Sequence, residues 1–596
     1  MSNLDAMLDQ AFLAYNQKDY DSAEDLARQV LTLAPAHGDG LYLLGLVASQ
    51  MGAYEPAEKL LYQAVQLYPE NKQYKLSLGF VLEKQGRLDE ALSFYEPYKA
   101  DAFVLSEIGF IYLQKGQLDF AKSAFDKSLS LNEDVLTAYI GKSLILRRQN
   151  LIQESLNILE EALTHGQSAE LYYQLAQAYR HVGKLKSALN AIAKALKIEE
   201  VASFYNEKGL IEEAQGLFEN AKNSYEMAIE KNAYSADGYA NLANIYFKEK
   251  DLKKAEDLYK RALGIDKDFL NAHHNLALVL YEQNRLTEAL EHLRSVIILN
   301  PNHTSGLYNL AIILEETGDY SESAGLYFNL LAQHKEIADL EFRIQNVLTL
   351  LAKGEKKDKK QALSFAKGWV KSFPESVVAE YTNASLNGQK VTDALSKAYA
   401  EALYDAFAPS YELEMKKLQS TVLEKMGEIL TNNDTKDVLD LGCGTGSLSS
   451  HLTTFNTLTG VDISQKMLLK AQEKEVYTRL VHQDIIGFLK EEKKQYDWVV
   501  ASDVTGYFSN IELFLSLVLE RLSPNGSFLF TIELGEGAED ITLLENARFV
   551  YKEEFVSNLL LKMGYDIQVK NEIPLRKEGL GIAKGILYLV QKKCVD

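Results

Sequence analysis

The chain has 596 residues, of which 47% are hydrophobic and 25% charged, so it is long enough for about four domains and has the composition of a folded globular protein. Its net charge is −21 and both halves are acidic, which argues against nucleic acid or an anionic membrane as the main partner. Two cysteines, Cys443 and Cys594, are too few for a disulfide framework or a thiolate metal cluster, so no metal site is expected.

We expect no targeting signal in the N-terminal residues. They lack a basic start followed by an apolar run, and no stretch of about 18 consecutive apolar residues occurs in the chain. The low cysteine count fits a reducing compartment. We therefore expect a cytoplasmic protein that makes no membrane contact.

The first 350 residues repeat a pattern of small side chains. Ten of these follow polar turns at intervals of 33 or 34 residues, with one interval of 30: Ala23, Ala57, Ala91, Ala121, Ser155, Ala188, Ala221, Ala255, Ala289 and Ser323. Proline follows some of them by twelve positions, as at Pro35 and Pro69. Small residues let two helices approach closely, and proline ends the second helix, so the period predicts a series of helical hairpins.

This pattern resembles the tetratricopeptide repeat (TPR), a 34-residue helical hairpin. The match gives ten units over residues 4 to about 337, with the third unit shortened around Pro97. An eleventh, divergent unit is predicted at 338–374, with the charged insert 354–360 in the turn between its helices. The resemblance implies an all-α solenoid over residues 1–394, closed by capping helices, whose concave face binds a protein or peptide.

Three asparagines, Asn241, Asn275 and Asn309, recur at intervals of 34 residues in this region. A carboxamide carries two donors and an acceptor, which suits a peptide backbone of any sequence. The arrangement resembles the asparagine ladder of O-linked GlcNAc transferases and implies a peptide groove, with His274 and Tyr308 beside it. The alternative is that these asparagines hydrogen-bond between neighbouring repeats.

From about residue 395 the sequence changes to short apolar runs separated by Gly, Asp and Asn. Runs ending near Asp440, Asp462 and Asp484 read as buried strands, and helical segments at 465–475 and 511–522 alternate with them. This order predicts a parallel sheet with helices on both faces. A ligand is then expected at the carboxyl ends of the strands.

Three alternate glycines follow Asp440 in the run LDLGCGTG: Gly442, Gly444 and Gly446. The GxGxG spacing differs from the GxGxxG of dinucleotide-binding folds. It resembles the first motif of class I S-adenosylmethionine-dependent methyltransferases, and residues 399–593 resemble a bacterial group of predicted methyltransferases with attached TPRs through LTGVDIS and GILYLVQKK. The resemblance implies an α/β Rossmann-like domain over 395–596 that uses S-adenosylmethionine.

The same resemblance assigns the cofactor contacts by position. It implies that Asp462 binds the ribose hydroxyls, Asp484 the adenine amino group and Asp440 the methionine amino group. The adenine ring would stack on the apolar residues Ile463, Ile485 and Met467. The methionine and ribose would lie on the loop residues Gly442, Cys443, Gly444 and Gly446, and Tyr404 and Tyr411 would cover the positively charged sulfonium.

Methyl transfer is an in-line displacement that positioning alone can accelerate, so a catalytic base need not exist. If the acceptor must lose a proton, Asp503 and Tyr507, just beyond the fourth strand, are the best-placed residues. The alternative is that Asp503 binds the cofactor or caps a helix.

We therefore expect a methyltransferase whose solenoid recruits a protein or peptide substrate. Two alternatives stay open at this stage. The enzyme could act on a small molecule while the solenoid organises a complex, or the chain could be a binding scaffold with an inactive methyltransferase domain.

Overall fold

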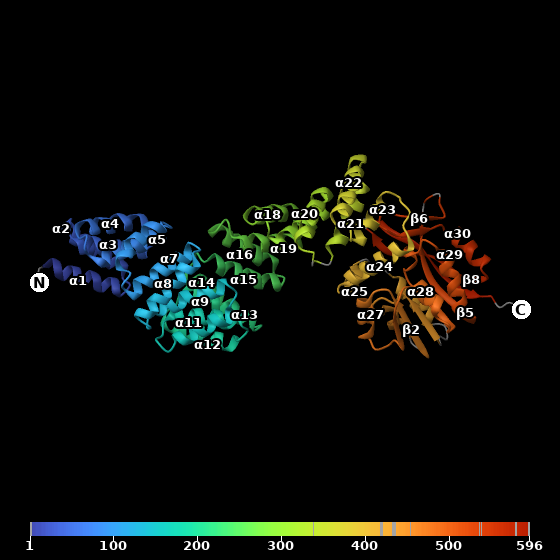
Figure 1. Ribbon diagram of the computed structural model, residues 1–596, viewed down its shortest axis with the longest axis horizontal. Helices are drawn as coiled ribbons and strands as arrows, with labels where there is room; N and C mark the ends of the chain where they lie inside the picture. The colour runs from blue at the N-terminus through green and yellow to red at the C-terminus, as the bar shows by residue number, and fades with distance from the viewer. Residues whose placement is uncertain are drawn as a thin grey trace. The chain divides into compact units, whose positions relative to one another are not determined.

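Figure 1 shows a computed structural model of the chain, which describes residues 3–335, 337, 339–417, 421–431, 437–452, 455–535, 537, 539–578 and 581–593. The chain divides into two compact units, residues 1–279 and residues 280–596. Cys443 is a buried, free thiol, and Cys594 lies outside the described residues. Within the described ranges, no helix combines the length and the apolar character needed to cross a membrane.

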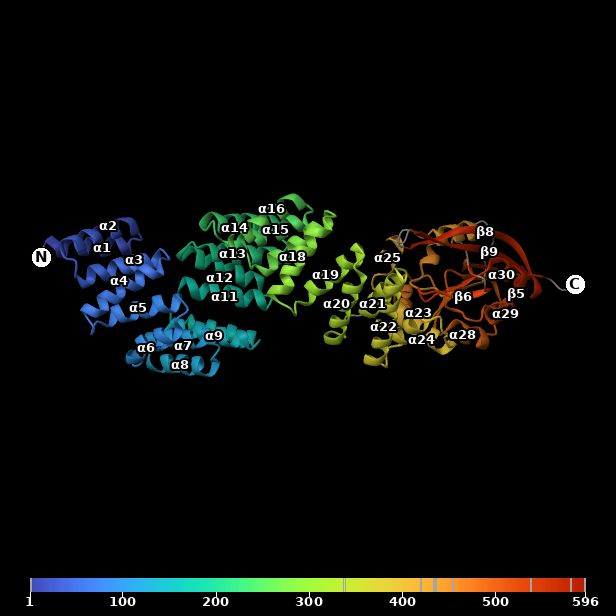
Figure 2. The same cartoon turned by 90° about the horizontal axis from the view of Figure 1, so that it is seen from above.

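The first unit is built from antiparallel helix pairs stacked side by side (Figure 2). The helices are α1 (Asn3–Asn16), α2 (Tyr20–Leu33), α3 (Gly38–Gln50), α4 (Tyr54–Leu67), α5 (Lys72–Lys84), α6 (Leu88–Tyr95), α7 (Ala102–Gln114), α8 (Leu118–Leu131), α9 (Leu136–Arg148), α10 (Ile152–Ala162), α11 (Ala169–His181), α12 (Leu185–Ile198), α13 (Ala202–Ala214), α14 (Phe218–Lys231), α15 (Ala236–Lys248), α16 (Leu252–Ile265) and α17 (Leu270–Glu282). The predicted small residues, such as Ala23, Ala57 and Ala121, are completely buried. The helical-hairpin prediction is confirmed.

The third hairpin is shorter than the others, as the sequence predicts. Helix α6 has only eight residues and runs into a 3₁₀ turn, η1 (Glu96–Tyr98), that contains Pro97. Proline cannot donate the backbone hydrogen bond that would continue the helix. Asp101 then caps α7 by accepting hydrogen bonds from the backbone of Phe103 and Val104.

The second unit begins with further helices of the same kind. These are α18 (Leu286–Leu299), α19 (Thr304–Thr317), α20 (Tyr320–Gln333), α21 (Leu340–Ala352), α22 (Lys356–Ser372), α23 (Val377–Leu386), α24 (Asp393–Phe407), α25 (Tyr411–Lys417) and α26 (Val422–Thr431). The eleventh hairpin is therefore present as α21 and α22. The prediction that 354–360 forms the turn is wrong, because Glu355 and Asp358 make a capping box and α22 already begins at Lys356.

A seven-stranded sheet follows, with the strand order β3-β2-β1-β4-β5-β9-β8. The strands are β1 (Asp437–Leu441), β2 (Thr457–Asp462), β3 (Arg479–His482), β4 (Tyr496–Ala501), β5 (Leu522–Glu533), β8 (Tyr565–Glu578) and β9 (Gly581–Lys592); β6 (Ile541–Leu543) and β7 (Phe549–Tyr551) form a separate ribbon. Strands β1 to β5 are parallel, as predicted, whereas β9 and β8 add to the sheet in antiparallel orientation. The predicted all-parallel sheet is wrong for this last hairpin.

Helices cover both faces of the sheet, which confirms the Rossmann-like α/β fold. On one face Leu439 and Leu441 belong to a core with α28 (Ile485–Glu491), α29 (Ile511–Arg521) and α30 (Glu553–Lys562). On the other face Val438 joins a core with Met426 of α26. A 3₁₀ turn, η2 (Ser447–His451), follows the glycine loop, and α27 (Gln465–Gln472) follows β2 in the helical segment predicted at 465–475.

Candidate active site

Three carboxylates gather at one edge of the sheet, where neighbouring parallel strands end. Asp440 lies near the end of β1, Asp462 is the last residue of β2, and Asp484 follows β3. The register pairs Asp440 with Gly460 and Asp462 with His482, so these strand ends are adjacent. The topology thus brings together residues that lie 22 positions apart along the chain.

The glycine loop after β1 needs residues without a Cβ atom. Gly442 has φ +73°, and a Cβ there would stand 2.2 Å from a methyl group of Val504. Gly444 has φ +54°, and its Cβ would meet nothing nearer than the Tyr411 ring at 4.0 Å. The bare backbone of Gly444 therefore faces open space, where a ligand can approach it closely.

Backbone amides hold the Asp462 carboxylate in place. One oxygen accepts a hydrogen bond from the Gly444 amide at 2.8 Å and the other from the Ser464 amide at 2.9 Å. The side chain is only 6% exposed, and this burial raises its pKa, while the two amides oppose the rise. The carboxylate is therefore fixed in orientation at the edge of the sheet.

Asp440 is still more buried, at 2% exposure. The Tyr477 hydroxyl donates a hydrogen bond to its carboxylate at 2.7 Å. Burial raises the pKa of Asp440 to about 7, and the charge of Asp462 acts in the same direction. A ligand ammonium group at this position would favour the ionised form.

Two adjoining cavities lie over these strand ends. The Asp484 cavity, of about 420 Å³, is lined by Asp462, Ile463, Asp484 and Ile485 and by Lys397, Tyr404, Asp503 and Tyr507, among others. The Asp440 cavity, of about 410 Å³, is lined by Asp440, Cys443, Thr445 and Lys474, among others. Both are lined by Tyr411, Gly442, Gly444, Ser502 and Asp503, so the two cavities meet at the glycine loop.

Nearly all of the predicted cofactor residues line one cavity or the other. The exceptions are Gly446 and Met467. Gly446 has φ +76° and packs against the Tyr477 ring, and Met467 is completely buried in the core. Their predicted cofactor contacts stay predictions. Asp484 also caps α28 through the Gly487 amide and pairs with Lys397 at 2.7 Å.

A charged network lies beside the cavities. Arg548 pairs with Asp503, and it donates to Glu533 at 2.8 Å and to the Tyr507 hydroxyl at 3.2 Å. Arg576 donates to Glu533 at 2.9 Å. The surrounding carboxylates raise the pKa of Arg548 well above its ordinary value, so it stays a cation despite burial. Asp503 itself has a left-handed backbone, with φ +54°.

Three tyrosines form the aromatic side of the same region. The Tyr404 hydroxyl donates to the Tyr507 hydroxyl at 3.3 Å, and their rings meet edge to face with centroids 5.7 Å apart. Tyr411 contacts Tyr404 in the same way at 6.4 Å. Burial raises the pKa of Tyr404 and of Tyr411, so both keep their protons at neutral pH. The predicted roles of Tyr404 and Tyr411 as a cover for the sulfonium, and of Tyr507 as a base, stay predictions.

Helix α24 connects this region with the last repeats of the second unit. On one side the Tyr399 ring stacks on Tyr381 of α23, with centroids 4.1 Å apart, and its hydroxyl donates to Gln345 of α21 at 2.7 Å. On the other side Lys397 and Tyr404 line the Asp484 cavity. Helical periodicity predicts only that α24 is amphipathic, so the sequence did not indicate Lys397 and Ser396 as cavity residues.

The predicted groove residues lie in two different units. In the first unit the Asn241 amide donates to Asn206 and the Asn275 amide donates to Asn244, each at 2.9 Å, and His274 lies 3.2 Å from the Asn275 carbonyl oxygen. In the second unit Tyr308 donates to Asp339. Asn309 also belongs to the second unit. These bonds between successive repeats match the alternative that the sequence left open, and peptide binding stays a prediction.

Family comparisons match the repeats and the region of the sheet separately. A model described as a methyltransferase domain matches residues 411–559. Tetratricopeptide-repeat models match residues 8–71, 42–103, 104–135, 169–201, 198–268 and 274–336. No cluster of metal-ligating side chains occurs in the described ranges.

The chain is similar to several known proteins over part of its length. It is 32% identical over 127 residues to a TPR repeat-containing protein of Methanocaldococcus jannaschii, covering 20% of this chain and 22% of the other. It is 25% identical over 144 residues to malonyl-[acyl-carrier protein] O-methyltransferase of Bacillus cereus, covering 23% and 53%. The chain spans between about a fifth and a half of the length of the curated relatives it matches. A solved tetratricopeptide repeat protein from Parabacteroides merdae is 21% identical, with a TM-score of 0.34 over 41% of this chain and 99% of the other.

Proposed function

Because the chain combines tetratricopeptide repeats with a methyltransferase domain, we propose that it transfers a methyl group from S-adenosylmethionine to a protein or peptide acceptor that the repeats recruit. One observation carries the cofactor assignment. Asp440, Asp462 and Asp484 end three adjacent strands and face two cavities that meet at a glycine loop. This arrangement offers one hydrogen-bond acceptor for each polar part of the cofactor: Asp440 for the methionine amino group, Asp462 for the ribose cis-diol and Asp484 for the adenine amine.

The residues present fit S-adenosylmethionine. The fixed carboxylate of Asp462 suits the two ribose hydroxyls. Asp484 suits the amino edge of an adenine ring, and Ile463 and Ile485, which line the same cavity, suit its faces. Asp440 and the bare Gly444 backbone suit the methionine end in the neighbouring cavity. When bound, S-adenosylmethionine supplies an electrophilic methyl group and a positive sulfonium, which aromatic rings such as Tyr404 and Tyr411 stabilise.

The tyrosine and arginine network is the proposed acceptor side. The Tyr507 hydroxyl accepts hydrogen bonds from Arg548 and Tyr404, so its own proton is available to orient an acceptor oxygen or nitrogen. Asp503 pairs with Arg548 and also lines both cavities, where it can receive a proton from the acceptor. The chain's own contribution is thus to orient the acceptor and to exclude water.

The recruitment of a protein or peptide acceptor by the repeats is a separate part of the proposal. Stacked helical repeats present long surfaces that bind extended chains. The name of the Bacillus cereus relative states that its acceptor, a malonyl group, is carried on a protein. A protein-borne acceptor fits a chain in which more than half of the residues form repeats.

A small-molecule acceptor is the second candidate. Tyr404 and Tyr411 help to line the Asp484 cavity, whose volume of about 420 Å³ lies in the range of small-molecule sites. A binding scaffold with an inactive methyltransferase domain is the third candidate.

Calorimetric titration of the full chain with S-adenosylmethionine tests the assignment. We expect micromolar binding that is lost in Asp462→Ala, because the ribose hydroxyls lose their carboxylate. Asp566→Asn, an exposed change on β8 that removes the same charge, serves as the control. Failure of the unaltered chain to bind would favour the scaffold, whereas full binding by Asp462→Ala would overturn the ribose assignment. Methyl transfer to proteins but not to small acceptors would separate the first two candidates.

A further inference from the structure

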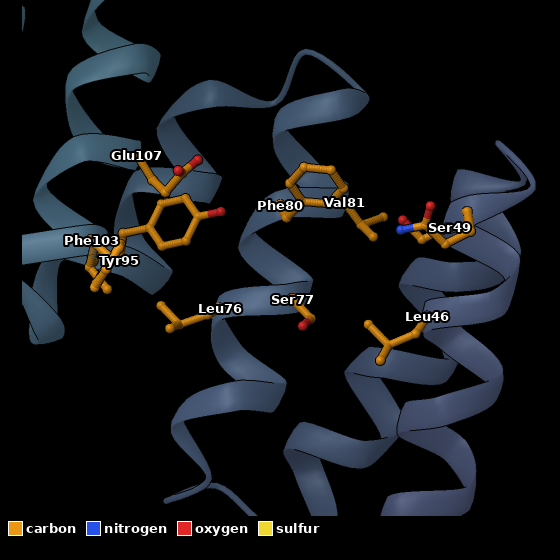
Figure 3. Close-up of a pocket in the computed structure, with 11 residues that line it drawn as sticks. Leu46, Ser49, Leu76, Ser77, Phe80, Val81, Tyr95, Phe103 and Glu107 are labelled. Carbon is orange, nitrogen blue, oxygen red and sulfur yellow. The ribbon is translucent and has the colours of Figure 1, made fainter. Parts of the chain in front are cut away.

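A cavity of about 250 Å³ lies on the first unit, far along the chain from the methyltransferase domain (Figure 3). Its walls come mainly from α3, α5 and α7, the first helices of three successive hairpins. Leu46 and Phe80 stand 34 residues apart, each directly after the small residue of its repeat, Gly45 or Gly79. They therefore occupy equivalent positions on one continuous face of the stacked helices.

The cavity exposes aromatic side chains that a folded protein ordinarily covers. Phe103 is 60% exposed and Phe80 is 38% exposed, while Tyr95 behind them is buried. Figure 3 shows Phe103, Tyr95 and the Glu107 carboxylate on one side of the cavity and Phe80 at its middle. Lys84 already lies over the Phe80 ring, with its ammonium 5.0 Å from the ring centroid. The Phe80 face thus accepts a cation from within the chain.

Polar groups in and beside this cavity lack protein partners. Glu107 is half-buried and makes no hydrogen bond or ion pair with the described residues. The Ser49 hydroxyl, in a side chain only 8% exposed, has no hydrogen-bond partner there either. Glu83, beneath the surface on α5, accepts a bond from Gln114 at 2.6 Å through one oxygen, and its other oxygen has none. Buried polar groups are ordinarily hydrogen-bonded, so a donor that enters this cavity would find acceptors there.

The charges around Glu107 are mainly negative. Burial and the nearby charge of Glu83 raise the pKa of Glu107 to about 7, and only Lys84 opposes the rise. Burial is the main cause of the raised pKa of Tyr95, and the charges of Glu107 and Glu83 act in the same direction. A half-buried carboxylate beside a second carboxylate is costly unless a cation joins it. A cation with an apolar stem would satisfy both the carboxylate and the aromatic wall.

We propose that this cavity, which we call the Glu107 pocket, binds the arginine side chain of an extended peptide. The inference rests on the proposed function in one respect, that the repeats recruit a peptide. An arginine guanidinium is planar, donates up to five hydrogen bonds and stacks on aromatic rings. It therefore pairs with Glu107 and lies against Phe80 or Phe103, while its methylene stem contacts the apolar wall.

The test uses the full chain and fluorescence anisotropy with the probe fluorescein-Gly-Leu-Ala-Arg-Ala-Leu-Gly-amide. The comparison peptide carries citrulline, a neutral analogue of arginine of nearly the same shape, in place of the arginine. We expect the arginine peptide to bind at least tenfold more tightly at pH 8. We also expect this preference to shrink at pH 6, where Glu107 is mostly protonated.

Glu107→Gln should abolish the preference by weakening the arginine peptide to the level of the citrulline peptide. Glu55→Gln, an exposed change on α4 outside the pocket, removes the same charge and should leave the preference intact. Phe103→Ala should weaken both peptides. Two results would overturn the assignment of arginine binding to the Glu107 pocket. One is equal binding of the two peptides by the unaltered chain, and the other is an unchanged preference for the arginine peptide in Glu107→Gln.

Two further measurements separate the possible outcomes. Arginine amide alone, tested as a competitor, should bind much more weakly than the peptide; equal affinity would assign the pocket to a free cationic molecule and overturn the peptide assignment. Titration of the same samples with S-adenosylmethionine reports on the other domain. An intact arginine preference without cofactor binding would overturn only the proposed methyl transfer, and the reverse result would overturn only the pocket.

Discussion

The hydroxyl of Tyr381, in the repeat region of the chain, donates a hydrogen bond to the backbone carbonyl of Ala547, at 3.3 Å. Ala547 immediately precedes Arg548, the cation that links Asp503, Glu533 and Tyr507. Two further repeat helices contact the same loop, because Thr349 of α21 donates to the Glu545 carbonyl at 3.1 Å and Lys359 of α22 pairs with the Glu545 carboxylate at 2.9 Å. The last repeats therefore contact the loop that carries Arg548, the residue that we propose to lie on the acceptor side.

A fragment that lacks these repeats should be less stable. We expect residues 390–596 to unfold at a lower temperature than residues 280–596, because Tyr399 loses both its stacking partner Tyr381 and its hydrogen-bond partner Gln345. Thermal unfolding followed by circular dichroism measures the difference. Equal unfolding temperatures for the sheet domain in both fragments would show that the repeats do not support it.

Arg548→Lys should reduce methyl transfer by roughly 10- to 100-fold while leaving the dissociation constant of S-adenosylmethionine unchanged. A lysine carries a single ammonium group and cannot link Asp503, Glu533 and Tyr507 in the fixed geometry of a guanidinium. Steady-state kinetics together with calorimetry separate the two effects. Arg479→Lys, at an exposed ion pair with Glu492, is the matched control and should retain full activity. A parallel loss of cofactor affinity in Arg548→Lys would argue against an acceptor-side role.

The pH dependence of stability should reveal the buried Asp440. Its pKa is about 7 in the folded chain against an ordinary value of 3.8, so between these values the folded state holds a proton that the unfolded state releases. Stability from this group therefore falls as pH rises through that window. Asp440→Asn removes the charge and should raise the free energy of unfolding by up to about 4 kcal/mol at pH 8, and by less at pH 5.

The same variant should weaken cofactor binding. In the unaltered chain we expect affinity for S-adenosylmethionine to increase from pH 6 to pH 8, as Asp440 ionises and attracts the methionine amino group. In Asp440→Asn the affinity should be lower and this increase should disappear. Calorimetric titrations at several pH values measure both. A variant with the same pH profile as the unaltered chain would place the amino group elsewhere.

Substitution at Asn275 distinguishes packing from peptide binding. Its amide donates to Asn244, and Tyr259 also donates to Asn244, so Asn275→Ala breaks a bond between repeats. We expect a loss of about 1 kcal/mol in the stability of the repeats. A ladder that serves only to bind peptide would leave the unfolding temperature unchanged and weaken only peptide affinity.

The features that the sequence predicted correctly are those that recur at a regular spacing along the chain. A 34-residue period shows where paired helices cross, and acids at successive strand ends such as Asp440 and Asp462 must meet at one edge of a parallel sheet. Other contacts have no such pattern. Glu533 of β5 meets Arg576 because β9 and β8 add to the sheet in antiparallel orientation, and it meets Arg548 from the loop before β7. The antiparallel hairpin itself escaped prediction because a buried strand reads alike in either direction.

Helix α24 packs against the last repeats and also lines the cavity of the methyltransferase domain. Its residue Tyr399 lies in the core of the repeats, and Tyr404, little more than one turn later, lines the cavity of the methyltransferase domain. A gene fusion that joined a new solenoid at the Gly388 turn would leave Tyr399 exposed and the Arg548 loop unsupported. The segment that must stay together during recombination is therefore larger than the methyltransferase domain. Recombination that preserves activity should occur within the repeats, N-terminal to α21, rather than at the C-terminal end of the repeats.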